Sequence, residues 1–226
     1  MRTLFDWLVV NQVVPINPAS SVKGPKYEVK KGKTPVLTAA EARKLLDAID
    51  VSSPVGLRDR ALIALMVYTF ARIGAVTRMR IEDDQVQGRR TWVRLQEKGG
   101  KRHEMPCCHH NHEEYPEEYL DGAGIEGDKK GYLFRTSRGR AGELSNLPMA
   151  QQHVHRMNGR RAADAGIRTK ISCHIFRATG IKEDLRNGGK PELAQQKANH
   201  ESVRTTGLYD RRNDRVSLDE VERILI

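Results

Sequence analysis

The chain has 226 residues, of which 38% are hydrophobic and 30% are charged, and its formal net charge is +10 at pH 7. This balance is typical of a globular protein with a polar surface. It argues against a membrane protein, because no apolar run approaches the ~20 residues that a bilayer span needs. The excess of basic residues favours a polyanionic partner, usually nucleic acid, although a merely basic soluble protein has the same composition.

The first predicted element is an amphipathic helix within residues 1–19, with Leu4, Leu8 and Val9 on one face. A signal peptide is not expected, because Asp6 comes early and no small-residue cleavage site follows. The three cysteines include an adjacent pair, which does not suit a disulfide framework and favours a reducing compartment.

A linker is predicted next, from the prolines, glycines and serines of NPASSVKGPKYEVKKGKTP. It has five lysines against a single acidic residue, Glu28. A basic linker can lie along a phosphate backbone, or it can be a solvated tether. The lysines are Lys23, Lys26, Lys30, Lys31 and Lys33.

Two helices are predicted after the linker. LTAAEARKLLDAI begins with a capping box formed by Thr38 and Glu41. GLRDRALIALMVYTFA is apolar on nearly all sides, which predicts a buried central helix, and Arg72 follows it directly.

The period then changes in RRTWVRLQEKGGKRHEMP, where Thr91, Val93 and Leu95 alternate with polar or larger side chains. The break at Gly99-Gly100 and the return to Met105 predict a β-hairpin. GYLFRTSRGR predicts one more short strand, and NHEEYPEEYL has helical spacing that Pro116 is expected to kink or split.

The rest of the chain is predicted to be helical, with Gly166 and Gly188-Gly189 as breaks. The expected helices are 149–165, 174–187, 191–199, 202–209 and 217–225. Together these elements predict an α+β fold that is mainly helical, with a small antiparallel β-sheet.

A set of polar side chains in these elements matches the needs of phosphodiester cleavage without a metal. That reaction needs cations for the non-bridging oxygens, a nucleophile, a proton acceptor and a proton donor for the leaving oxygen. Taken singly, each residue has an ordinary explanation, such as a helix-end cation or a core aromatic. The candidates are Arg72, Lys98, His174, Arg177, His200 and Tyr209.

Four stretches, in this order, resemble the tyrosine recombinases, the family of phage-type integrases: TFARIGAVTRMRIED, EKGGKRHEMP, CHIFRATGI and ANHESVRTTGLYDRR. The resemblance spans residues 36 to 226 and implies that the fold is the catalytic domain of that family. It implies that Arg72 and Arg177 are the two catalytic arginines and that Tyr209 is the nucleophile. His174 and His200 correspond to the two histidines of the family.

The resemblance also implies that Lys98 is the hairpin lysine, with Lys101 as the alternative because the turn contains both. Lys101 and Arg102 are further expected to contact DNA, together with the five lysines of the linker. The family often has a glutamate three residues after the first arginine, where this chain has Ala75. Any carboxylate that orients Arg72 must therefore come from elsewhere. Ala178 stands where a histidine is common.

By the same resemblance, residues 1–35 are expected to be a terminal helix and basic linker, the remnant of an amino-terminal core-binding domain. Residues 36–226 are expected to be the catalytic domain. The implied activity is site-specific DNA cleavage and rejoining through a 3′-phosphotyrosyl intermediate, with no cofactor. The implied partners are double-stranded DNA and three further copies of the chain on two DNA sites, in the cytoplasm with the nucleoid.

Two alternatives stay open. The first is a catalytically inactive, DNA-binding remnant of an integrase. The second is a metal protein that uses the cluster Cys107, Cys108, His109, His110 and His112. Adjacent ligands fit a zinc site poorly, because such sites space their ligands and draw them from two segments.

Overall fold

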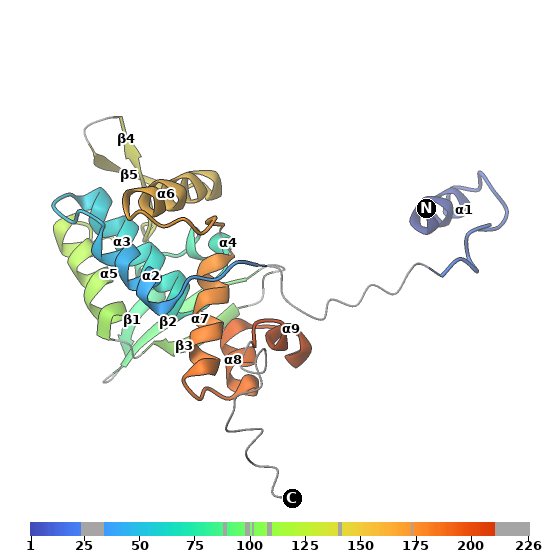
Figure 1. The fold of residues 1–226 in the computed structure, drawn as a ribbon. Coiled ribbons are helices and arrows are strands. Elements are labelled where there is room, and N and C mark those ends of the chain that lie inside the picture. The colour runs from blue at the N-terminus through green and yellow to red at the C-terminus, as the bar shows by residue number, and fades with distance from the viewer. Residues whose placement is uncertain are drawn as a thin grey trace, which may run out of the picture. The chain divides into compact units, whose positions relative to one another are not determined.

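A computed structural model describes residues 1–23, 34–87, 90–97, 100, 102–107, 110–139, 142–172 and 174–210. The chain divides into two compact units, residues 1–30 and residues 31–226. Figure 1 labels the elements. The α-helices are α1 (Arg2–Val10), α2 (Ala39–Asp47), α3 (Pro54–Tyr68), α4 (Ile73–Val76), α5 (His110–Gly122), α6 (Gln151–Asp164), α7 (Ile175–Arg186), α8 (Pro191–Ala198) and α9 (Val203–Gly207). The strands are β1 (Asp84–Gln87), β2 (Arg90–Gln96), β3 (Arg102–Cys107), β4 (Arg135–Arg138) and β5 (Glu143–Pro148), and a 3₁₀ turn, η1, spans Ile81–Asp83.

The first unit contains α1, which ends well before the end of the predicted segment 1–19. The chain leaves the helix at Asn11, and Gln12 has a positive φ of 58°. Asn17 then donates a hydrogen bond of 2.6 Å to the carboxylate of Asp6, which folds residues 11–17 back along the helix. None of the residues of α1 is buried.

The predicted start of α2 is confirmed by a complete capping box. The Thr38 hydroxyl accepts a hydrogen bond from the Glu41 backbone N–H, and the Glu41 carboxylate accepts one from the Thr38 backbone N–H. Four otherwise unpaired N–H groups begin every helix, and the box satisfies one of them and the N–H of the cap itself.

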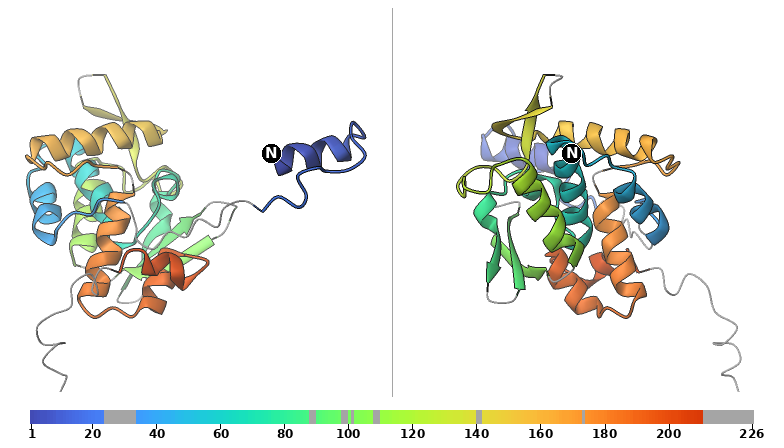
Figure 2. Two further views of the ribbon diagram at one scale, coloured as in Figure 1. Left: turned by 45° about the vertical axis from the view of Figure 1, so that its right-hand side comes forward. Right: turned by 90° about the vertical axis from the view of Figure 1, so that its left-hand side faces the viewer.

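Helix α3 is the buried central helix that the sequence predicts. Side chains all round it are buried, and Figure 2 shows α5 and α7 on either side of it. The buried Asp59 is paired with Arg58 and with Arg161, whose Nη2 lies 2.8 Å from it. These ion pairs are necessary because burying an unpaired carboxylate would reduce the stability of the fold by roughly several kcal/mol.

The predicted hairpin is formed by β2 and β3, which pair antiparallel with Gln96 opposite Arg102. Val93 and Leu95 are buried in the core, as their alternation predicts. The sheet also contains β1 on the other side of β2, in the order β1-β2-β3, which the sequence analysis did not predict. The predicted strand within 131–140 is β4, and it pairs with β5, which was not predicted either.

Of the kink or split expected at Pro116, the split is wrong, because α5 runs through Pro116 as a single helix. Pro116 is buried, Tyr119 is fully buried, and the Tyr119 ring stacks on Phe134. The packing of α5 against α3 therefore offsets the backbone hydrogen bond that proline removes. The four predicted helices between 149 and 209 are confirmed as α6 to α9, with ends that differ by at most two residues. The predicted helix 217–225 lies outside the described residues.

The end of α3 and the middle of α7 approach each other closely. A Cβ atom on Gly180 would lie 2.1 Å from the Val67 carbonyl oxygen and 2.7 Å from the ring of Phe70. Because no larger residue fits there, glycine allows α7 to pack directly on the turn that leads to Arg72. Phe70 itself has a left-handed backbone, with a φ of 55°, and this turns its carbonyl toward α7.

None of the described helices is long and apolar enough to cross a membrane. Over the described residues the architecture is mainly helical, as the sequence predicts, with two small antiparallel sheets where one was predicted.

Candidate functional site

The structure places Arg72 at the N-cap of α4, immediately after the turn that ends α3. Its Nη1 donates a hydrogen bond of 2.7 Å to Oε2 of Glu97, the residue directly after β2. The Glu97 side chain is 4% exposed, whereas that of Arg72 is 36% exposed. The ion pair therefore joins a buried carboxylate to a guanidinium that solvent, or a ligand, can still reach.

Arg177 lies in the first turn of α7 and is almost fully buried. Its guanidinium donates to two backbone carbonyls, those of Phe70 and Ala198, and so bridges the ends of α3 and α8. Burial, followed by the positive charge of Arg72, lowers the pKa of Arg177 to about 10, against the opposing effects of Tyr209 and Glu97. The group remains a cation at neutral pH.

His200 comes two residues after the end of α8, and the C-cap residue between them, Asn199, has the left-handed backbone typical of a helix C-terminus. Its Nδ1 lies 2.9 Å from the buried hydroxyl of Thr206. Burial and the charges of Arg177 and Arg72 lower the pKa of His200 to about 4, so the imidazole is neutral at pH 7.

Tyr209 lies just after α9, and its backbone N–H donates to the carbonyl of Thr206. The ring stacks on that of His200, with centroids 5.8 Å apart and planes 9° from parallel. It also packs against a small apolar cluster made by the end of α3 with α7 and α8. The cluster consists of Phe70, Ile181, Leu185, Ala194 and Ala198.

The structure thus brings four of the six predicted catalytic residues close enough for their side chains to interact: Arg72, Arg177, His200 and Tyr209. They come from four separate elements, the turns after α3, α8 and α9 and the start of α7. The constellation needs this packing, because Arg72 lies far in sequence from the consecutive segments that hold Arg177, His200 and Tyr209.

His174 is placed differently. It is exposed at the N-cap of α7, and its side chain does not cap the helix. Its side chain makes no hydrogen bond to any described residue, although His174 lies three positions before Arg177. The candidate hairpin lysines, Lys98 and Lys101, lie outside the described residues.

The residues expected to contact DNA are only partly described. Lys23 is exposed in the first unit, and Arg102 is exposed at the start of β3 in the second. The remaining lysines of that set lie outside the described residues: Lys26, Lys30, Lys31, Lys33 and Lys101.

The structure does not describe the side chains of the alternative metal cluster, which spans residues 107–112. Over the residues that it does describe, no group of three or more His, Cys, Asp or Glu side chains is arranged to hold a metal ion.

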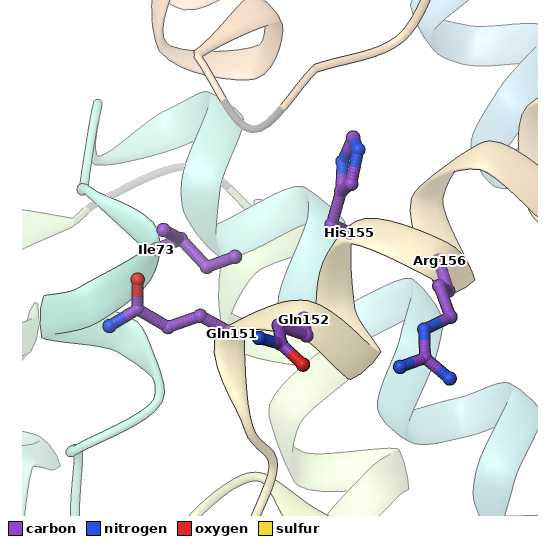
Figure 3. Close-up of a pocket in the computed structure, with 5 residues that line it drawn as sticks. All are labelled: Ile73, Gln151, Gln152, His155 and Arg156. Atoms are coloured by element: carbon purple, nitrogen blue, oxygen red, sulfur yellow. The ribbon is translucent and has the colours of Figure 1, made fainter.

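An open pocket of ≈360 Å³ lies beside the start of α4, the helix that Arg72 caps (Figure 3). Ile73 lines it on one side and four residues of α6 line it on the other. Figure 3 shows His155 and Arg156 projecting from α6 in different directions. The α6 residues are Gln151, Gln152, His155 and Arg156.

With this geometry, the class of protein is a mainly helical catalytic domain of the tyrosine recombinase type. Residues 35–215 match the model of the phage integrase family, and the chain belongs to that family. It is 25% identical over 213 residues to the tyrosine recombinase XerC of Escherichia coli O127:H6, covering 92% of this chain and 66% of XerC. The chain therefore spans just under two thirds of the length of this relative.

Two solved structures show the same fold. The XerH site-specific recombinase, in a pre-cleavage complex with its difH substrate, is 20% identical with a TM-score of 0.67. The alignment covers 97% of this chain and 61% of that one. A lambda integrase tetramer bound to a Holliday junction is 19% identical with a TM-score of 0.63, covering 96% and 58%.

Sequence reasoning missed two residues at this site, Glu97 and Thr206. The absence of a carboxylate at Ala75 did indicate that Arg72 needs one from elsewhere, and Glu97 lies next to the candidate Lys98 in sequence. No sequence signal pointed to Thr206, because one of two adjacent threonines in a short helix has no distinguishing spacing.

Proposed function

We propose that this chain is the catalytic domain of a site-specific DNA recombinase, which cleaves and rejoins double-stranded DNA through a 3′-phosphotyrosyl intermediate. The observation that carries the proposal is the convergence of Arg72 and Arg177 with the tyrosine–histidine stack of Tyr209 and His200. A bare DNA-binding face needs cations but has no use for a tyrosine held beside them.

In the proposed reaction, the phenolic oxygen of Tyr209 attacks a DNA phosphorus, and the bond from phosphorus to the 5′ oxygen breaks. The phenolic proton passes to His174, and the departing 5′ oxygen receives a proton from Lys98. The ester conserves the energy of the phosphodiester bond. The 5′ hydroxyl of a partner strand can therefore reverse the step with no ATP and no metal.

The two arginines take the charge that develops on the non-bridging oxygens. Arginine suits this role because its planar fork bonds two oxygens and stays protonated. Arg177 is preorganised by its bonds to the Phe70 and Ala198 carbonyls, so it does not reorganise during the reaction.

His200 acts as a neutral hydrogen-bonding group, because its pKa of about 4 leaves it uncharged at pH 7. If the Thr206 hydroxyl donates to Nδ1, the ring carries its proton on Nε2 and can donate it to a phosphate oxygen. In that arrangement Thr206 positions His200 and selects its tautomer.

The alternative is a catalytically inactive, DNA-binding relative, which the alanines at positions 75 and 178 favour. Incubation with a nicked suicide substrate, drawn from the DNA that flanks the gene, separates the two. The recombinase accumulates a covalent protein–DNA adduct that survives denaturation, whereas the inactive relative binds the same DNA without forming one.

We further propose that the chain acts as a homotetramer on two DNA sites, in the cytoplasm with the nucleoid. The tetramer in which lambda integrase was solved on a Holliday junction supports this assembly.

DNA affinity is expected to fall steeply with salt, because the net charge of +10 supplies cations that displace counterions from the phosphates. With roughly six phosphates contacted, the affinity drops about 1000-fold between about 50 and 200 mM salt. Fluorescence anisotropy with a labelled duplex measures the slope. A complex whose affinity does not depend on salt contradicts the proposed mode of binding.

The Lys98→Ala variant is expected to lose adduct formation on ordinary DNA and to regain it when sulfur replaces the bridging 5′ oxygen. A thiolate leaves without a general acid, so the substitution bypasses the lysine. Lys101→Ala is the matched control from the same turn. If sulfur rescues Lys101→Ala and not Lys98→Ala, the general acid is Lys101.

A further inference from the structure

Arg72 and Arg177 create an electrostatic problem in the absence of DNA. The positive charge of Arg72 lowers the pKa of the buried Arg177, and both guanidinium groups also lower the pKa of His200. The two guanidinium cations repel each other, and solvent screens this repulsion little because Arg177 is buried. Arg177 is fixed by two backbone carbonyls, so the more exposed Arg72 is the cation that repulsion can displace.

The carboxylate of Glu97 offsets the repulsion between the two arginines. It is buried, it bonds Arg72 at 2.7 Å, and its negative charge also opposes the lowering of the Arg177 pKa. Neither Ala75 nor Ala178 can supply such a charge. A charge-assisted hydrogen bond of this length fixes the orientation of a guanidinium as well as its position.

The bond uses only part of the hydrogen-bonding capacity of Arg72. A guanidinium has five N–H donors, and Nη1 spends one of them on Glu97. The remaining donors and the 36% exposure of the Arg72 side chain leave it able to bond a phosphate at the same time. Glu97 therefore orients the arginine without occupying it.

We propose that Glu97 is the positioning residue for Arg72, holding its guanidinium where the phosphate binds, in place of a carboxylate at position 75. This inference rests on the proposed function. Because Glu97 ends β2 and directly precedes Lys98 in sequence, the same ion pair ties the base of the hairpin to the arginine site.

The rival account of this ion pair is inhibition, in which Glu97 competes with the phosphate for Arg72. The two accounts predict opposite effects of removing the carboxylate. A positioning residue that is lost slows the reaction, whereas a competitor that is lost speeds it or tightens binding of DNA.

The first experiment measures the rate of adduct formation at saturating DNA. Glu97→Ala is expected to lower that rate by about 100-fold, the scale of a misplacement by ~1 Å. Glu97→Gln keeps a hydrogen-bond acceptor without the charge, and its rate is expected to fall less. It also serves as a control in case the alanine variant folds poorly. Glu104→Ala is the matched control, because Glu104 pairs with Arg94 on the same hairpin, away from Arg72. A Glu97→Ala rate equal to or above that of the unaltered chain overturns the inference.

The second experiment needs no cleavage, so it separates failure of this inference from failure of the proposed function. DNA affinity is measured for Arg72→Ala in the natural and the Glu97→Ala backgrounds, at one fixed salt concentration. Loss of Arg72 is expected to weaken binding roughly tenfold in the natural background and far less without Glu97. Equal effects in both backgrounds would mean that Glu97 does not position Arg72. Coupling in a protein that forms no adduct sustains the inference and removes only the proposed chemistry.

Discussion

Replacement of Tyr209 by phenylalanine is expected to abolish the covalent adduct on a suicide substrate while leaving DNA affinity nearly unchanged. The substitution removes one oxygen atom. The phenyl ring still stacks on His200 and still packs against the apolar cluster beneath α7 and α8. Arg72, Arg177 and His200 do not replace the Tyr209 hydroxyl as the nucleophile in the proposed reaction, so we expect the loss of adduct to be complete.

The measurement is denaturing electrophoresis of the adduct, beside anisotropy measurements of binding with the same duplex. Tyr132→Phe is a suitable control, because Tyr132 packs under the Arg80 guanidinium and is not part of the site. An adduct that persists in Tyr209→Phe would assign the nucleophile to another residue.

The second large effect is expected for Arg177→Ala, which should reduce the rate of adduct formation by at least ~100-fold. The variant loses a preorganised cation, and it also leaves the buried carbonyls of Phe70 and Ala198 without their donor. Each unsatisfied group costs about 1–3 kcal/mol, so the free energy of unfolding should fall as well. Arg177→Lys retains the charge but cannot bridge both carbonyls with one ammonium, and we expect it to recover little activity.

Arg186→Ala is the control for this series, because Arg186 lies at the exposed end of the same helix and pairs only loosely with Glu183. Urea denaturation separates the two consequences of losing Arg177. If Arg177→Ala reacts at the natural rate wherever it is folded, its role is structural and the transition-state assignment is wrong.

Local patterns determined much of the fold. The Thr38–Glu41 capping box, the apolar run of α3 and the alternation of β2 each depend on a few neighbouring residues, so the sequence alone predicts them correctly. The strands β1 and β5 were missed because short, polar strands have no period of their own and form only when a partner edge is available.

The family could also be predicted, because Arg72, Arg177, His200 and Tyr209 lie in recognisable stretches. Their catalytic roles stay predictions. What those residues contact could not be predicted. The positive φ of Phe70 and the lack of a side chain at Gly180 together bring the Phe70 carbonyl within reach of Arg177, across more than 100 residues of chain.

Glu97 shows the same division most clearly. Because position 75 is an alanine, the sequence predicts that another carboxylate orients Arg72, and several acidic residues of the chain are candidates. Only the packing of the hairpin against the start of α4 decides that the carboxylate is Glu97. Which charges form an ion pair depends on their distance in space and on their burial, and the spacing of residues in the sequence specifies neither.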